Sequence, residues 1–181
     1  MGLDQHDRLD HDKAMTFLTL NDPNEIPAPI DPPPGDWRLG SAVTVFRLDA
    51  AGEIQVLMGR RKGAHGAGTY AFPGGKLDGQ GLYTAALREL AEETGLVGVP
   101  IAYLGDVYRE FEDKDKGLQR WRTLYALVSA SGEPRTLEPQ KSYGWNWHYL
   151  DSLPEPLFAP ASEFICAGRL EQAAVAWLER R

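Results

Sequence analysis

The sequence predicts one mixed α/β domain, and three features of the chain support this fold class. Apolar runs of strand length, separated by glycine-containing turns, occupy residues 41–59 and return in residues 97–129. A charged helical segment stands between these two groups of strands, and a second helical pattern ends the chain. Strands and helices in this order indicate a layered domain that mixes the two kinds of element.

The predicted strands begin with residues 41–48 and 54–59, which a turn at residues 49–52 joins. Residues 71–73, Ala-Phe-Pro, form a short strand that ends in a turn. Further strands are predicted at residues 97–111 (one or two strands), 121–129 and 145–149, with the charged connection 112–117 between the first two.

The end of the chain, residues 159–181, has the spacing of one amphipathic helix that packs on the sheet. Cys166 stands among its apolar residues, so we expect a core thiol rather than a nucleophile. Trp145 and Trp147 belong to the preceding strand, where core packing is the favoured role and stacking on a nucleobase the alternative. The apolar residues of the helical pattern are Phe164, Ile165, Leu170, Ala174, Trp177 and Leu178.

Length and composition bound the class of protein. With 181 residues, 43% of them hydrophobic, the chain can form one domain with a substantial core. A formal net charge of −7 argues against broad binding to nucleic acid, which needs a basic surface. No apolar run approaches the roughly 20 residues of a membrane span, and no secretory signal is visible. The single cysteine suits a reducing compartment, so we expect a cytoplasmic protein; a homodimer stays possible.

Residues 1–36 differ in composition from the rest of the chain. They contain eight acidic residues against Arg8 and Lys13, and six prolines lie between positions 23 and 34. Proline at this density cannot fill a helix or a central strand, so we predict an acidic, proline-rich extension that is extended or disordered. Within it, the apolar run at residues 15–20 can still dock as an edge strand. The globular domain is then residues 37–181.

Residues 88–93, Arg-Glu-Leu-Ala-Glu-Glu, concentrate three carboxylates and one guanidinium on one predicted helix. At about 100° per residue, Glu89, Glu92 and Glu93 fall within roughly a 100° arc, because positions three and four apart share a face. Such close like charges repel unless a cation lies among them. Arg88 can offset part of that repulsion, and a divalent metal ion with oxygen ligands can offset more. The alternative is a solvated acidic face.

A Gly-Gly turn precedes this helix and Gly95 ends it. Turn, acidic helix and glycine stop together resemble the Nudix hydrolases, whose signature is G-x5-E-x7-R-E-U-x-E-E-x-G-U, with U a bulky aliphatic residue. The resemblance implies a Nudix α/β/α sandwich with a central mixed sheet for residues 37–181. Eight of the nine fixed positions match, namely Gly74, Arg88, Glu89, Leu90, Glu92, Glu93, Gly95 and Leu96.

The position that departs from the signature is Gln80, where the family has glutamate. An amide can keep a hydrogen bond, but it carries no charge and cannot act as a base. In the family this glutamate mostly supports the helix, so the change is compatible with an active enzyme. The same change is also the feature that would mark an inactive one.

The resemblance implies that Glu89, Glu92 and Glu93 bind Mg²⁺ or Mn²⁺ together with the carbonyl of Gly74 or Gly75. Arg88 then orients one of these carboxylates, a task that suits its rigid fork of donors. The predicted catalytic residues are thus Arg88, Glu89, Glu92 and Glu93. A general base is expected among Glu89, Glu93 and the loop acids Glu110, Glu112, Asp113 and Asp115.

Three cations, Arg60, Arg61 and Lys62, stand in a segment that also contains four glycines. Cations beside flexible backbone amides can bind polyphosphate oxygens, so we predict substrate binding here, with a solvated charged loop as the alternative. His65 of the same loop is expected in solvent, and a phosphate contact is its alternative. The glycine pattern and the later stretch 138–147 are similar to a MutT-like subgroup of the Nudix enzymes.

The activity that the resemblance implies is metal-dependent hydrolysis of a nucleoside diphosphate linked to another group. The favoured substrate is a nucleoside triphosphate, cut to monophosphate and pyrophosphate. One alternative is ADP-ribose or a nucleoside diphosphate sugar. The other is a Nudix domain that senses a nucleotide without cleaving it, and Gln80 is the feature that favours this alternative.

Overall fold

The computed structural model of the protein describes residues 18–29, 33–63 and 65–181. Residues 1–17 and 30–32 of the predicted extension lie outside this description. The strands are β1 (Arg38–Thr44), β2 (Phe46–Leu48), β3 (Ile54–Arg61), β4 (Tyr70–Ala71), β5 (Val97–Asp113), β6 (Gly117–Ser131) and β7 (Ser142–Tyr149). The helices are α1 (Leu82–Thr94), α2 (Ala159–Cys166) and α3 (Arg169–Leu178). Within the described residues, no helix is both long and apolar enough to cross a membrane.

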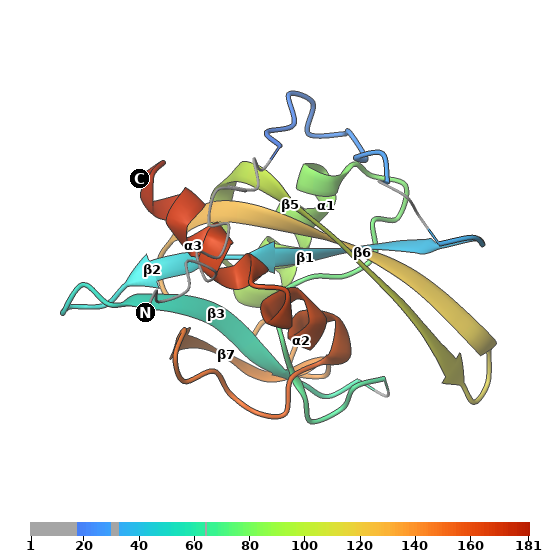
Figure 1. The fold of residues 1–181 in the computed structure, drawn as a ribbon. Coiled ribbons are helices and arrows are strands. Elements are labelled where there is room, and N and C mark those ends of the chain that lie inside the picture. The colour runs from blue at the N-terminus through green and yellow to red at the C-terminus, as the bar shows by residue number, and fades with distance from the viewer. Residues whose placement is uncertain (1–17, 30–32, 64) are drawn as a thin grey trace, which may run out of the picture.

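The strands form two sheets between which the chain passes back and forth: β1, β5 and β6 belong to one, and β2, β3, β4 and β7 to the other (Figure 1). In the first sheet, β6 is central, with β1 parallel to it on one side and β5 antiparallel on the other. In the second sheet, β3 pairs antiparallel with β2, β4 and β7. Parallel and antiparallel pairs coexist in the first sheet, so the predicted mixed α/β fold with a mixed sheet is confirmed.

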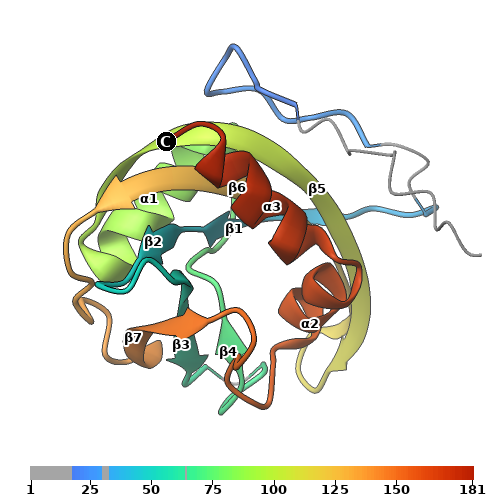
Figure 2. The same cartoon turned by 60° about the vertical axis from the view of Figure 1, so that its left-hand side comes forward.

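Helix α1 and the α2–α3 pair lie on opposite sides of the strands (Figure 2). Strand β6 serves both sides, because successive side chains of a strand point to opposite faces. Tyr125 and Leu127 enter the core cluster under α2 and α3. Leu124, Ala126 and Val128 enter the cluster under α1. One strand therefore separates two apolar cores, as a helix–sheet–helix sandwich requires.

The single helix predicted for residues 159–181 is wrong, because the chain forms α2 and α3 with a break between them. Gly168 lies at the break with φ 70°, a left-handed conformation that glycine adopts at little cost. The apolar spacing nevertheless continues across the break, since Phe164 of α2 and Leu170 of α3 are buried in the same cluster.

Two expectations about burial have different outcomes. Cys166 is exposed, so the prediction of a core thiol is wrong. The physical reason is the helical turn of about 100° per residue, which carries Cys166 away from the direction of buried Phe164. Core packing of Trp145 and Trp147 is confirmed, since both rings pack against the cluster under α1. Positions two apart in a strand share one face, so the two rings lie together.

Residues 18–29 of the predicted extension lie against the domain and run beside the start of α1 (Figure 1). Leu18 forms a single antiparallel bridge with Tyr103 of β5. Leu20 is buried in the cluster under α1. The described part of this segment therefore has fixed contacts with both β5 and the neighbouring core.

We predict that Gly59→Ala destabilises the fold by about 1–3 kcal/mol, a cost typical of overpacking. A Cβ atom at this position of β3 would lie 2.5 Å from the Trp145 ring, which covers the glycine. The measurement is chemical denaturation with a fluorescence readout. Gly63→Ala is the matched control, because a Cβ atom there meets no atom within 4 Å. Equal stability of the two variants would contradict this account.

Candidate active site

The carboxylate face of α1 packs against the turn formed by Gly74 and Gly75. A Cβ atom on Gly74 would lie 2.1 Å from the carbonyl oxygen of Ser41. One on Gly75 would lie 2.4 Å from the carboxyl carbon of Glu89. The turn is tied to β1, because the N–H of Ser41 donates to the carbonyl of Gly75 at 2.7 Å. Only glycine leaves room for a carboxylate and a strand on either side of this turn.

Glu93 is buried against the same turn, with 8% of its surface exposed. Its Oε2 accepts a hydrogen bond from the N–H of Gly74 at 3.0 Å. Burial raises the pKa of the Glu93 carboxyl to about 7, and the charge of Glu89 adds to this rise, although the Gly74 hydrogen bond opposes it. A carboxyl group with this pKa can take up a cation in place of its proton near neutral pH.

Arg88 connects the acidic helix with the turn before it. Its Nη1 donates to Oε1 of Glu89 at 2.8 Å and to Oε2 of Glu92 at 3.0 Å. Its Nη2 donates to the carbonyl of Lys76 at 2.9 Å. Its Nε donates to Oε1 of Gln80 at 2.8 Å. The planar guanidinium thereby holds two carboxylates in fixed directions, which is the orienting contact expected of this residue.

The contact with Gln80 explains how the chain tolerates its departure from the signature. The amide oxygen accepts the Nε hydrogen bond of Arg88, as a glutamate oxygen would in the same place. The substitution therefore keeps the support of the helix and removes one negative charge beside Arg88.

The donor set of α1 fits a hard divalent cation. Glu89, Glu92 and Glu93 all offer carboxylate oxygens, the ligands that Mg²⁺ and Mn²⁺ prefer. Among the residues that the structure describes, there is no group of three His, Cys, Asp or Glu side chains whose present positions could hold a metal ion together. Glu89 and Glu92 are turned toward Arg88, and Glu89 lies against the backbone of Gly75. The roles of these residues as ligands stay a prediction that the donor chemistry supports.

A cleft of about 370 Å³ opens beside the Gly74–Gly75 turn. One end of it is aromatic: the ring of His65 stacks on Phe111 at 3.6 Å between centroids and meets the edge of Phe158 at 5.4 Å. His65 is thus an exposed side chain with two ring contacts. Five cations also line the cleft, namely Arg38, Arg61, Lys76, Arg109 and Lys116.

Of the three predicted substrate-binding cations, only Arg61 lines the cleft. Its guanidinium lies 4.2 Å from the centroid of the Phe158 ring and donates to the carbonyl of His65. Arg60 and Lys62 lie instead over the ring of Tyr143, at 5.4 and 4.5 Å. Alternation along β3 and its continuation explains this separation, because neighbouring side chains of an extended segment point to opposite sides.

Of the four loop acids predicted as candidate bases, Glu112 and Asp115 do not line the cleft. Glu110 and Asp113 line it. Glu110 is bound to Arg120 at 2.5 Å, and Asp113 accepts hydrogen bonds from the backbone N–H groups of residues 115 and 116. Both are therefore already engaged in contacts that shape the β5–β6 hairpin.

Glu138 and Lys141 are two charged residues near α1 to which the sequence analysis assigned no role. They form an ion pair at 2.8 Å. Next to the dominant effect of burial, Glu138 raises and Lys141 lowers the pKa of Glu93. The loop reaches α1 through the N–H of Leu137, which donates to the carbonyl of Glu93 at 3.2 Å. The available signal was the Glu-Pro-Gln-Lys stretch that resembles the MutT-like subgroup.

The comparison with known protein families agrees with this geometry. The NUDIX domain pattern matches residues 38–167, so the chain belongs to the Nudix family. The fold, the acidic helix and this membership define a Nudix hydrolase, an enzyme that cleaves pyrophosphate linkages.

Solved structures of known Nudix proteins show the same fold. A MutT NUDIX hydrolase from Burkholderia pseudomallei is 29% identical, with a TM-score of 0.60 over 76% of this chain and 98% of that chain. The NUDIX domain of Shewanella oneidensis NrtR, solved with ADP ribose, is 23% identical, with a TM-score of 0.58 over 77% and 88%. A C. elegans Ap4A hydrolase is 17% identical, with a TM-score of 0.53 over 80% and 99%.

We predict that Glu93→Gln abolishes turnover and stabilises the metal-free fold above pH 7. The pKa of Glu93 is raised from 4.5 to about 7, so the folded state keeps a proton that the unfolded chain loses. The metal-free protein therefore loses stability as the pH rises from about 4.5 through 7. The amide needs no proton and keeps the Gly74 contact, so the gain at pH 8 is about 1–3 kcal/mol.

Thermal unfolding of both proteins in a chelating buffer, at pH 5 and pH 8, measures this effect. The two stability curves should converge at low pH and separate at high pH. Curves that stay parallel would show that the burial of Glu93 has no electrostatic cost.

Proposed function

We propose that this Nudix hydrolase cleaves a nucleoside triphosphate to a nucleoside monophosphate and pyrophosphate, with Mg²⁺ or Mn²⁺ held by Glu89, Glu92 and Glu93. When bound by these carboxylates, the ion would supply Lewis-acid chemistry, offsetting phosphate charge and making the attacking water more acidic. The substrate occupies the cleft with its base toward Phe111 and Phe158 and its phosphates toward the turn of Gly74 and Gly75.

The observation that carries this proposal is the position of Arg61. Its guanidinium lies over the Phe158 ring, at the aromatic end of the cleft. Burial lowers the pKa of Arg61, whereas the negative charge of Glu93 raises it, so the same group also lies within the field of the acidic helix. A cation between an aromatic surface and a carboxylate cluster suits a phosphate chain that joins a base to a metal.

The remaining groups have roles in positioning and charge. Lys76 and Arg38, on the wall of the cleft, supply positive charge for the outer phosphates. Arg88 holds Glu89 and Glu92, so their oxygens need little reorganisation before they act. In the reaction, a water oxygen bonds to one phosphorus as the bond from that phosphorus to its bridging oxygen breaks. The proton of the water passes to a carboxylate at this face, and pyrophosphate leaves.

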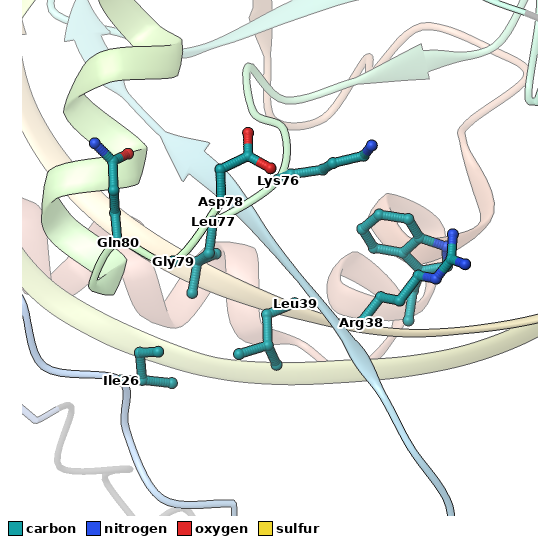
Figure 3. A pocket seen from close by; sticks show the side chains of 9 residues that line it. Ile26, Arg38, Leu39, Lys76, Leu77, Asp78, Gly79 and Gln80 are labelled. Carbon is teal, nitrogen blue, oxygen red and sulfur yellow. The ribbon is translucent and has the colours of Figure 1, made fainter.

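A second candidate substrate is a nucleoside diphosphate joined to a sugar or another nucleoside. A further cavity, of about 380 Å³, adjoins the cleft and shares Arg38, Lys76 and Trp121 with it. Its apolar wall comes from Ile26 and Leu39, whose side chains lie near one another in Figure 3. A group attached beyond the diphosphate has space there, next to two cations and an indole ring.

Turnover of the purified protein against a substrate panel tests both candidates. The panel contains canonical, oxidised and methylated nucleoside triphosphates, ADP-ribose and dinucleoside polyphosphates, with Mg²⁺ and with Mn²⁺. Pyrophosphate and a monophosphate from a triphosphate support the first proposal. AMP from ADP-ribose, with intact triphosphates, would replace it by the second. Binding without any product would contradict both.

We predict that Arg61→Gln lowers kcat/KM by about ten- to a hundredfold, the loss expected when a charge-assisted hydrogen bond to phosphate disappears. Arg60→Gln is the matched control, because it removes the same charge one residue away, outside the cleft. Steady-state kinetics on the best substrate of the panel compare the two. Similar losses in both variants would favour a general effect of charge over a specific contact.

A further inference from the structure

The N-terminal segment, residues 18–29, lies outside the span of the family match and contacts the start of the acidic helix. Helix α1 begins after Gly81, and no side chain caps its first N–H groups. Carbonyl groups of the segment take this role: the N–H of Leu82 donates to Glu25 at 2.9 Å, and that of Thr84 donates to Pro23 at 3.2 Å. These are two of the four N–H groups that a helix start leaves without partners.

The close approach of the segment accounts for the glycine at position 81. Its φ of −72° and ψ of 168° suit any residue, so backbone conformation does not require glycine there. A Cβ atom, however, would lie 2.0 Å from the backbone carbonyl carbon of Asn24. The hydroxyl of Thr84 adds contacts to the carbonyl of Pro23 at 3.1 Å and to Oδ1 of Asn24 at 3.0 Å.

Two anchors hold the segment on the domain. At one end, Leu20 is buried in the cluster that α1 covers, and its N–H donates to the hydroxyl of Tyr83 at 3.4 Å. At the other end, the carbonyl of Pro27 accepts a hydrogen bond from Nη2 of Arg122 at 2.6 Å. Arg122 is itself buried and paired with Asp106 at 2.5 Å. The contacts with α1 therefore lie between two fixed points.

A continuous chain of contacts leads from this segment to the carboxylates. Asn24 fixes the place of Gly81, which is bonded directly to Gln80. Gln80 accepts the Nε hydrogen bond of Arg88. Arg88 holds Glu89 and Glu92. Ile26 of the segment also faces the loop before α1 across the cavity in Figure 3.

We infer that residues 18–29 form a positioning element of the active site, which sets the place of α1 and thereby the geometry of its metal-binding carboxylates. The inference rests on the proposed role of Glu89, Glu92 and Glu93 as metal ligands. The segment itself touches no reacting atom, so its effect appears in metal binding and in kcat rather than in contacts with the base.

The test is Gly81→Ala in the full chain, which adds one methyl group where Asn24 lies. We expect Mn²⁺ to bind about tenfold or more weakly to this variant. Titration calorimetry in the absence of substrate measures this affinity. At saturating metal, kcat is expected to fall about ten- to a hundredfold with little change in KM, since a misplacement of about 1 Å can cost a hundredfold. Hydrogen exchange should accelerate at the N–H groups of Leu82 and Thr84 and stay unchanged at Gly95.

Two further variants separate positioning from stability. Thr84→Val removes the hydroxyl that contacts the Pro23 carbonyl and Asn24 Oδ1 without adding volume, and it should shift metal affinity in the same direction by a smaller factor. Ala173→Gly in α3 lowers stability away from the site. At a matched loss of Tm it should leave Mn²⁺ affinity unchanged.

Faster exchange at Leu82 and Thr84 with wild-type Mn²⁺ affinity would overturn the inference. Equal losses of affinity in Gly81→Ala and Ala173→Gly would overturn it as well. The calorimetric result does not depend on the substrate. If Gly81→Ala weakens Mn²⁺ binding but the wild-type protein cleaves no compound of the panel, the proposed function is contradicted. The positioning role of residues 18–29 is still supported in that case.

Discussion

The contact between the carboxylate face of α1 and the bare backbone of Gly74 and Gly75 is the constraint on which the site depends. It brings buried acidic groups to a turn that belongs to the sheet through β1. Burying carboxylates is costly unless hydrogen bonds or cations compensate. The Gly74 N–H and the Arg88 guanidinium provide part of that compensation. The remaining cost appears in the raised pKa of Glu93, which a bound cation would relieve.

The two apolar cores on either side of β6 fix the register of this strand, and the position of the Gly74–Gly75 turn depends on that register. Strand β6 sends alternate residues into the cluster under α1 and into the cluster under α2 and α3. A shift of one residue in β6 would exchange the two sets of side chains, which differ in size and shape, and would disturb the packing of both cores. Its parallel pairing with β1 carries this register to Ser41, the residue that binds the turn. The sheet thus places the turn, and the turn places the acidic groups.

Features that depend on neighbours in sequence were predictable. A helix through residues 88–93, its stop at Gly95 and the shared face of Glu89, Glu92 and Glu93 follow from spacing and glycine chemistry alone, whereas its start at Leu82 was not predicted. The signature also pointed to the turn. The break at Gly168 was missed because apolar spacing continues across it, which made two helices look like one.

Features that depend on distant parts of the chain were not predictable from one sequence. Alternation along the strand separates Arg61 from Arg60 and Lys62, but which side faces the cleft depends on how β3 sits in its sheet. The ion pair of Glu138 and Lys141 lies near α1 because the long loop before β7 folds back and hydrogen-bonds to this helix. Nothing in the proline-rich composition of the first 36 residues indicates which of their carbonyls meet a helix start.

The β5–β6 hairpin extends as a long arm beyond a bend in β5. Register shifts at residues 100–102 and 103–105 bend β5, and Gly105 has φ 99° there. From this bend to Phe111, six residues at about 3.3 Å each give an arm of roughly 20 Å. A rotation of about 5° at the bend then moves Phe111 by nearly 2 Å, about half the thickness of an aromatic ring. The position of Phe111, and with it the width of the aromatic part of the cleft, is therefore sensitive to small differences of angle at Gly105.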